Sequence, residues 1–271
     1  MIILLLSIFT ININKQFENI DKHFENIDKR FDSINEKLDY LTGKKSKDIS
    51  TISSCFIIVK DKNDKEYYGS GNLVNINNNL FVATCLHNFY DNTTGMIYIP
   101  EIIQNKDRKL KFDKEKIIFD INSKYDLALI PITEEDNIKD KAAFISNRTS
   151  EAGEKLYGTN YYLGEYSFGE CYVVSTNLGP SYLKTNCPGK RHYSGTGYFN
   201  TDGFLAAIHK SGLKYTNELS EDIFEDHNLY VSDRARNPRS ILVDAKYLIN
   251  LYQKRKILIR KYQKMLKKAG L

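Results

Sequence analysis

The chain of 271 residues has only four cysteines, Cys55, Cys85, Cys171 and Cys187, and no two of them form a CxxC pair. They are too few and too irregularly spaced to define a disulfide scaffold. The lack of CxxC pairs also argues against a zinc site. We therefore expect neither a metal nor any other cofactor.

The sequence also lacks an apolar run of membrane-spanning length. Residues 1–11 are apolar, but they cover about half of the roughly 20 residues that a membrane helix needs. This start has neither the positively charged region nor the A-x-A cleavage site of a signal peptide. Because nothing else in the sequence indicates an oxidising compartment, we favour a cytoplasmic location over secretion.

Acidic residues are absent from positions 246–271, which carry nine Lys or Arg. Since the net charge of the whole chain is +5, the remainder carries −4. A basic tail can bind nucleic acid or an anionic membrane, but a solvated helix face explains the charge equally well, and we favour that interpretation. An apolar helical stripe predicts that the chain up to 252 packs on the main domain and that the basic helix 253–271 extends outward or meets a partner.

Hydrophobic residues make up 41% of the chain and aromatic residues 12%, which is too rich a composition for a disordered protein. The length predicts one principal domain. In residues 51–252, short apolar runs alternate with clusters of Asn, Asp, Gly and Lys, a pattern typical of antiparallel barrels or sandwiches. The polar stretch 44–50 is predicted to be a linker that follows a helix stop at Gly43.

Residues 1–43 are predicted to form an apolar segment followed by a coiled coil. Positions 14–41 hold four consecutive heptads, NKQFENI, DKHFENI, DKRFDSI and NEKLDYL. Phe or Leu at one heptad position and Ile or Leu three residues later make an a/d seam. Because an isolated helix of this length is marginal in water, we predict a parallel homo-oligomer through residues 14–41. The alternative is a helix that folds back on its own domain.

Three stretches carry the residue types that acyl transfer requires. They are GSGNLVNINNNLFVATCLHN at 69–88, KYDLALIPI at 124–132 and HYSGTGYFNTDGFLAAIHKSG at 192–212. A serine hydroxyl holds its proton at neutral pH, so its attack needs a neutral imidazole as base. The imidazole in turn needs a carboxylate that fixes its tautomer. We assign Ser194 as nucleophile, His87 as base and Asp126 as the orienting carboxylate.

These motifs resemble those of the trypsin-like, or chymotrypsin-fold, serine proteases, in the order His, Asp, Ser across residues 51–252. GSGNLV followed by ATCLH resembles the family's strand and T-A-A-H motif, DLALI matches the segment that begins at the catalytic Asp, and YSGTGYFN resembles D-S-G-G-P-V-F-N. The resemblance implies a mostly β fold of two perpendicular six-stranded antiparallel barrels, with the triad in the cleft and a C-terminal helix. It also implies hydrolysis of peptide bonds in a protein substrate through an acyl-enzyme.

The sequence departs from the family pattern at the residues around Ser194. The family has glycine two residues before the nucleophile, where its N–H joins that of the serine in the oxyanion hole; here the pair is His192 and Ser194. Histidine adopts a positive φ only at some cost. Tyr193 stands where the family has Asp, so activation by a newly freed N-terminus is not expected. A catalytically weak, peptide-binding module clustered by its coiled coil is therefore the alternative function.

The resemblance also places the pocket for the side chain before the cut bond. It implies pocket residues Pro188, His209, Ser211 and Gly212, and His209 matches the pocket histidine of glutamyl endopeptidases. An imidazole there can donate a hydrogen bond to Glu or Gln, so we predict a preference for these residues; the alternative is that His209 is a core residue. If the barrel forms, Cys55 and Cys85 lie close together, and we favour buried free thiols over a disulfide.

Overall fold

The computed structural model describes residues 2–105, 108–133, 138–162, 165–176, 181–187, 192–212 and 240–270. The chain divides into two compact units, Met1–Lys44 and Lys45–Leu271. No helix in the described part of the chain is long and apolar enough to cross a membrane.

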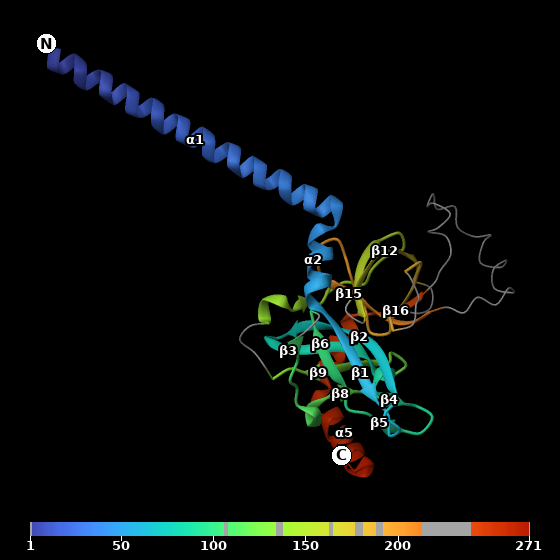
Figure 1. Ribbon diagram of the computed structural model, residues 1–271. Helices are drawn as coiled ribbons and strands as arrows, with labels where there is room; N and C mark the ends of the chain where they lie inside the picture. Colours follow the sequence, from blue (N-terminus) through green and yellow to red (C-terminus); the bar gives the residue numbers. More distant parts are fainter. Residues whose placement is uncertain are drawn as a thin grey trace, which may run out of the picture. The chain divides into compact units, whose positions relative to one another are not determined.

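The first unit is the helix α1, Ile2–Thr42 (Figure 1). Gly43 has φ 65°, the left-handed conformation that commonly ends a helix. From Phe17 to Leu38 the apolar residues at the predicted a and d positions are exposed, with values of 60% for Phe17, 61% for Phe24 and 45% for Ile27. The helix thus carries an apolar stripe with no covering side chains in its own unit, and its pairing with a second copy stays a prediction.

The stretch predicted as a linker, 44–50, is helical instead and belongs to α2, Lys44–Ser53. Ser46, Ser50 and Ser53 recur every three or four residues and are all buried, so they form one face of the helix. Ser46 Oγ donates to the carbonyl of Asn200 at 2.5 Å, and Ser50 Oγ lies 2.7 Å from Thr159 Oγ1. These partners are far away in sequence, which is why the polar composition alone suggested a linker.

The first half of the second unit is an eight-stranded sheet, in which seven strands are antiparallel neighbours and one strand is parallel. Its order is β7 (Arg108–Lys109), β6 (Glu101–Gln104), β1 (Ser54–Lys60), β2 (Glu66–Ile76), β3 (Asn79–Cys85), β9 (Leu127–Pro131) and β8 (Ile118–Phe119), with β10 (Ala143–Phe144) parallel to β2. The short helices η1 (Leu86–Asn88), η2 (Lys114–Lys116) and η3 (Lys139–Lys141) and the hairpin β4 (Tyr90–Asp91) and β5 (Met96–Ile97) complete it.

This sheet differs from the six-stranded barrel that we predicted, because no ladder joins its ends within the described residues. The end strands β7 and β8 are only two residues long each, and too short to extend the pairing. The apolar interior is closed instead by side chains of the C-terminal helix, with Tyr262 and Leu266 packed among the buried residues of the sheet.

The second half of the unit is a closed six-stranded barrel, as predicted. Its order is β11 (Lys155–Tyr162), β12 (Glu165–Ser175), β13 (Tyr182–Thr185), β16 (Ser240–Asp244), β15 (Leu205–Gly212) and β14 (Gly197–Phe199). Cys171 and Cys187 form a disulfide, which we did not predict. The two cysteines meet because β12 and β13 are antiparallel neighbours. Cys55 and Cys85 are buried free thiols, as favoured from the sequence.

The C-terminal residues form α4, Lys246–Gln253, and α5, Arg255–Ala269. The prediction that 253–271 extends outward was wrong, because Leu258, Tyr262 and Leu266 of α5 are buried. The basic residues Lys256, Lys261, Lys264, Lys267 and Lys268 are exposed. The helix is therefore amphipathic, with a basic outer face of the kind that solvation explains.

Candidate active site

His87 and Asp126 are brought together by the pairing of two strands. His87 lies in η1 directly after β3, and Asp126 directly precedes β9. Cys85 at the end of β3 pairs with Leu127 at the start of β9, so the residues that follow and precede these strands lie side by side. The backbone N–H of Leu86 donates to the carbonyl of Asp126 at 3.0 Å.

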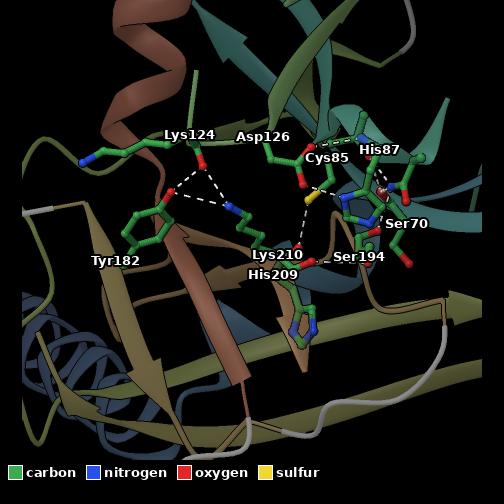
Figure 2. Close-up of polar contacts among 11 residues, drawn as sticks. Ser70, Cys85, His87, Lys124, Asp126, Tyr182, Ser194, His209 and Lys210 are labelled. Carbon is green, nitrogen blue, oxygen red and sulfur yellow. Dashed lines mark hydrogen bonds and ion pairs between the residues drawn. The ribbon is translucent and has the colours of Figure 1, made fainter. Parts of the chain in front are cut away.

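Both carboxylate oxygens of Asp126 contact His87 (Figure 2). Oδ2 lies 2.5 Å from Nδ1 of the ring, and Oδ1 accepts the backbone N–H of His87 at 3.0 Å. A ring that donates from Nδ1 to a carboxylate presents Nε2 as its proton acceptor. The side chain of His87 is 36% exposed against 18% for Asp126, so the base faces the cavity while its orienting group lies deeper.

Ser194 is held beside this pair through its backbone. Its carbonyl accepts the N–H of Ser70 at 2.9 Å and the side-chain amide of Asn88 at 2.9 Å. Asn88 directly follows His87, and Ser70 lies on β2. The turn that carries Ser194 is therefore attached to β2 and to η1, the short helix that also carries His87. The side chains of Ser194 and His87 line one cavity of about 680 Å³.

The hydroxyl of Ser194 does not hydrogen-bond to the imidazole of His87 in the described structure. Its Oγ lies 3.5 Å from the carbonyl of Lys210 on β15 (Figure 2). Hydrogen bonds between catalytic groups are often long or misaligned before substrate binds and tighten in the complex. The side chains of Ser194 and His87 thus line one cavity, and Asp126 contacts His87 at its edge, while the serine hydroxyl points to the carbonyl of Lys210.

Asn88 and Ser70 are site residues that our sequence analysis did not identify. Asn88 Nδ2 also donates to Thr84 Oγ1 at 2.9 Å, and Ser70 Oγ donates to the carbonyl of His192 at 2.7 Å. Both lie inside the stretch 69–88, and the position of Asn88 directly after His87 was the one local signal for either of them.

His192 stands where the trypsin-like proteases have glycine, and its backbone has a positive φ. Its φ is 72°, a region that costs a residue with a Cβ about 1–2 kcal/mol. Its carbonyl accepts from Ser70 Oγ at 2.7 Å and from Asn160 Nδ2 at 3.2 Å, and its ring packs edge-on against Tyr68. These contacts hold the strained backbone of the turn in one conformation.

Gly195 fills a space in which no side chain fits. Its φ is 92°, and a Cβ at this position would lie 1.9 Å from the carbonyl oxygen of Ser70 and 2.5 Å from Thr84 Oγ1. Its N–H donates to the carbonyl of His209 at 2.8 Å. Glycine is therefore required for the nucleophile turn to approach β2 and β3 this closely.

We expect Gly195→Ala to lower the free energy of unfolding by at least about 3 kcal/mol, because a backbone clash adds to the cost of the positive φ. Urea unfolding followed by circular dichroism measures this loss. Gly153→Ala is the matched control, since Gly153 has φ 87° with nothing within 4 Å of its added Cβ; it is expected to cost only about 1 kcal/mol. Equal losses in the two variants would show that the close approach at Gly195 is unimportant.

The four predicted pocket residues do not all lie in one part of the described structure. Pro188 lies outside the described residues. Ser211 and Gly212 lie on β15 and pair with β16, while β14 covers only the earlier part of the strand, from Leu205 to Ile208. Within the part of the chain that the structure describes, no strand pairs with the second edge of β15 at Ser211 and Gly212.

His209 is buried, with 1% exposure, next to the rings of Tyr193 and Tyr198. Its ring atom Nδ1 has no hydrogen-bond partner among the described residues. Burial, and then the nearby charge of His87, lowers the pKa of His209 from 6.5 to about 4. His209 is therefore neutral near pH 7, and a protonated ring is disfavoured in the folded protein.

This lowered pKa predicts how stability depends on pH. Between pH 6.5 and 4 the unfolded chain binds more protons at His209 than the folded chain does, so stability falls as the pH falls. When the pH is lowered from 6.5 to 4, we expect the free energy of unfolding of the wild type to fall by about 3 kcal/mol more than that of His209→Gln. Urea unfolding of both proteins at the two pH values measures the difference, and parallel losses would contradict the prediction.

Cys85, His87 and Asp126 are the described residues whose donor atoms come close enough for a metal, within 4.8 Å of one another. The imidazole and the carboxylate already contact each other, and Cys85 Sγ donates to the carbonyl of His209 at 3.0 Å. Burial, and then the charge of Asp126, raises the pKa of the Cys85 thiol. Since metal binding needs a thiolate, this arrangement favours acid–base chemistry over a metal site.

No protein-family model and no curated protein sequence matches the chain. Solved structures do share its fold. A serine endoprotease from Yersinia pestis matches with a TM-score of 0.58 at 15% sequence identity, over 80% of this chain and 66% of that one. The Rv3671c protease from M. tuberculosis, in its active form, matches with a TM-score of 0.52 at 10% identity, over 76% of this chain and 81% of that one.

The chain has the fold of the trypsin-like serine proteases. The resemblance inferred from three short motifs is therefore confirmed at the level of the fold. The chain spans 66% of the length of the Yersinia enzyme. The similarity to glutamyl endopeptidases in the pocket stays a prediction.

Proposed function

We propose that this protein is a serine endopeptidase that cuts a protein substrate through an acyl-enzyme. The observation that carries the proposal is the His87–Asp126 pair, which opens onto the same cavity as Ser194. In this mechanism Ser194 attacks the scissile carbonyl, and His87 first accepts the serine proton and then gives it to the leaving amine. The N–H groups of Ser194 and His192 stabilise the oxyanion.

A fluorophosphonate probe tests this proposal on the purified full-length protein, because it reacts only with an activated serine. We expect labelling of the wild type at Ser194 and none of Ser194→Ala. A folded wild type that stays unlabelled would remove the enzyme hypothesis. It would favour the alternative of a peptide-binding module, which is supported by the long contact of Ser194 Oγ with Lys210 and by the histidine at position 192.

A preference for Glu or Gln before the cut bond is a second part of the proposal. It is supported by the buried ring of His209, whose Nδ1 has no partner among the described residues. It is also supported by the edge of β15 at Ser211 and Gly212 that no described strand pairs, where an extended peptide can pair as an added strand. Because His209 is neutral, it suits the uncharged Gln side chain better than Glu. A peptide library cleaved by wild type and by His209→Ala tests the pocket; identical preferences would exclude His209 from it.

We also propose that α1 assembles the protein into a parallel homo-oligomer. The support is the exposed stripe of Phe17, Phe24 and Phe31, together with the opposite charges at the flanking positions of residues 14–41. Light scattering should give a multiple of the chain mass for the full protein and the single mass after deletion of residues 1–43. An unchanged number of chains in the deletion variant would refute the oligomer.

A further inference from the structure

The cavity of about 680 Å³ extends from the catalytic residues along the β2 side of the site. His87, His192 and Ser194 form one end of it. The remaining walls come from the end of β1, the start of β2 and the segment after His87. They are Val59, Glu66, Tyr67, Tyr68, Asn88, Phe89, Tyr90, Asp91, Asn92, Thr93 and Tyr98.

This cavity lies on the leaving-group side of the site, an assignment that rests on the protease function proposed above. The acyl half of the substrate is assigned to β15, where His209, Ser211 and Gly212 lie. No residue of β15 lines the cavity. A peptide that crosses Ser194 from β15 therefore places the residues after the cut bond in this space.

The walls of the cavity are aromatic and acidic. Tyr67, Tyr68, Tyr90 and Tyr98 supply four phenol rings, and none of the lining residues is a Lys or Arg. Ring faces attract cations and stack with a guanidinium. An elongated side chain with a positive end is the kind of group that such walls accommodate.

The two carboxylates of the lining differ in how far they are neutralised. Glu66 is paired with Lys60 at 3.1 Å and accepts the hydroxyl of Tyr68. Asp91 accepts the N–H of Thr93 at 2.8 Å and the hydroxyl of Thr94 at 2.6 Å. No cation pairs with Asp91 among the described residues. Its negative charge is therefore the one in the lining that is still available to a ligand.

We propose that this cavity binds an arginine or lysine side chain of the substrate, one or two residues after the cut bond, with Asp91 as its counter-charge and the tyrosines as its walls. Together with the pocket at His209, this defines a substrate with a Glu or Gln before the cut and a basic residue after it. The two halves of the preference are carried by separate groups of residues and can be tested separately.

The test uses the full-length protein and quenched fluorescent peptides that share the best acyl half from the library and differ only after the cut. In one set of peptides the first or second residue after the cut is arginine. In the matched set that residue is citrulline, which has nearly the same shape without the charge. We expect kcat/KM to be about tenfold higher for the arginine peptide. Asp91→Asn should reduce this ratio to about twofold, because the aromatic walls remain.

Asp113→Asn is the matched control. Asp113 also accepts a backbone N–H two residues along, that of Glu115 at 3.0 Å, but it lies outside the cavity lining. Its substitution should leave the ratio at the wild-type value. The rate of fluorophosphonate labelling should be the same in all three proteins, which shows that the site is intact.

Equal kcat/KM for arginine and citrulline in a wild type that is labelled at Ser194 would overturn this inference and leave the protease function standing. An unchanged ratio in a labelled Asp91→Asn variant would overturn the role of Asp91. A wild type that is not labelled would overturn the protease function and this inference with it.

Discussion

Replacing Ser194 by alanine is expected to lower kcat/KM for peptide hydrolysis by at least about 10⁴-fold. The substitution removes the nucleophile but leaves the anchors of its turn in place, because these are backbone groups. The Ser194 carbonyl accepts from Ser70 N–H and Asn88 Nδ2, and alanine offers the same carbonyl. The variant should therefore fold and bind peptide like the wild type.

Two measurements on the same samples separate chemistry from binding. Steady-state cleavage of the best library peptide gives kcat/KM, and fluorescence anisotropy of a labelled peptide gives Kd. We expect kcat/KM to fall by at least about 10⁴-fold and Kd to change by less than about threefold. Hydrolysis that persists in Ser194→Ala would assign the activity to another group or to a contaminant. Tight binding without cleavage in the wild type would favour the peptide-binding module.

The contact between His87 and Asp126 could be predicted from the sequence because each residue lies next to a strand whose pattern is visible locally. The run LALIP defines β9, and the apolar run before His87 defines β3, so the positions of His87 and Asp126 at the strand ends follow from antiparallel pairing. The short apolar strands of the second half predicted a barrel or a sandwich, and the resemblance to the protease family implied the six-stranded barrel that this half forms.

The errors concern contacts between residues far apart in the sequence. Nothing near Ser70 shows that its N–H meets the carbonyl of Ser194, 124 positions later. The serines of α2 become a packing face only because Ser46 donates to the carbonyl of Asn200 and Ser50 hydrogen-bonds with Thr159. The amphipathic pattern of α5 predicted a helix but not the sheet on which it packs. Local sequence patterns show the period of a helix or a strand. The closure of a sheet and the packing of a helix on it depend on residues that are distant in the sequence.

Asp126→Asn is expected to lower kcat by about 10⁴-fold with little change in KM. Asparagine is the informative substitution because Asp126 has φ 59°, a conformation that Asn tolerates and Ala does not. The amide oxygen can still accept the N–H of His87, so the local backbone is preserved. The amide NH₂ then faces Nδ1 and forces the ring to carry its proton on Nε2, where it can no longer accept the proton of Ser194.

This outcome distinguishes orientation of the base from simple support of the fold. Urea unfolding of Asp126→Asn should stay within about 1 kcal/mol of the wild type, while fluorophosphonate labelling slows in parallel with kcat. The Asp113→Asn variant is the matched control, because Asp113 is an acid that caps a turn outside the site. This substitution should leave kcat unchanged. A loss of less than about tenfold in kcat would show that the carboxylate does not set the tautomer of His87. The contact of 2.5 Å between the two side chains would then have a structural role only.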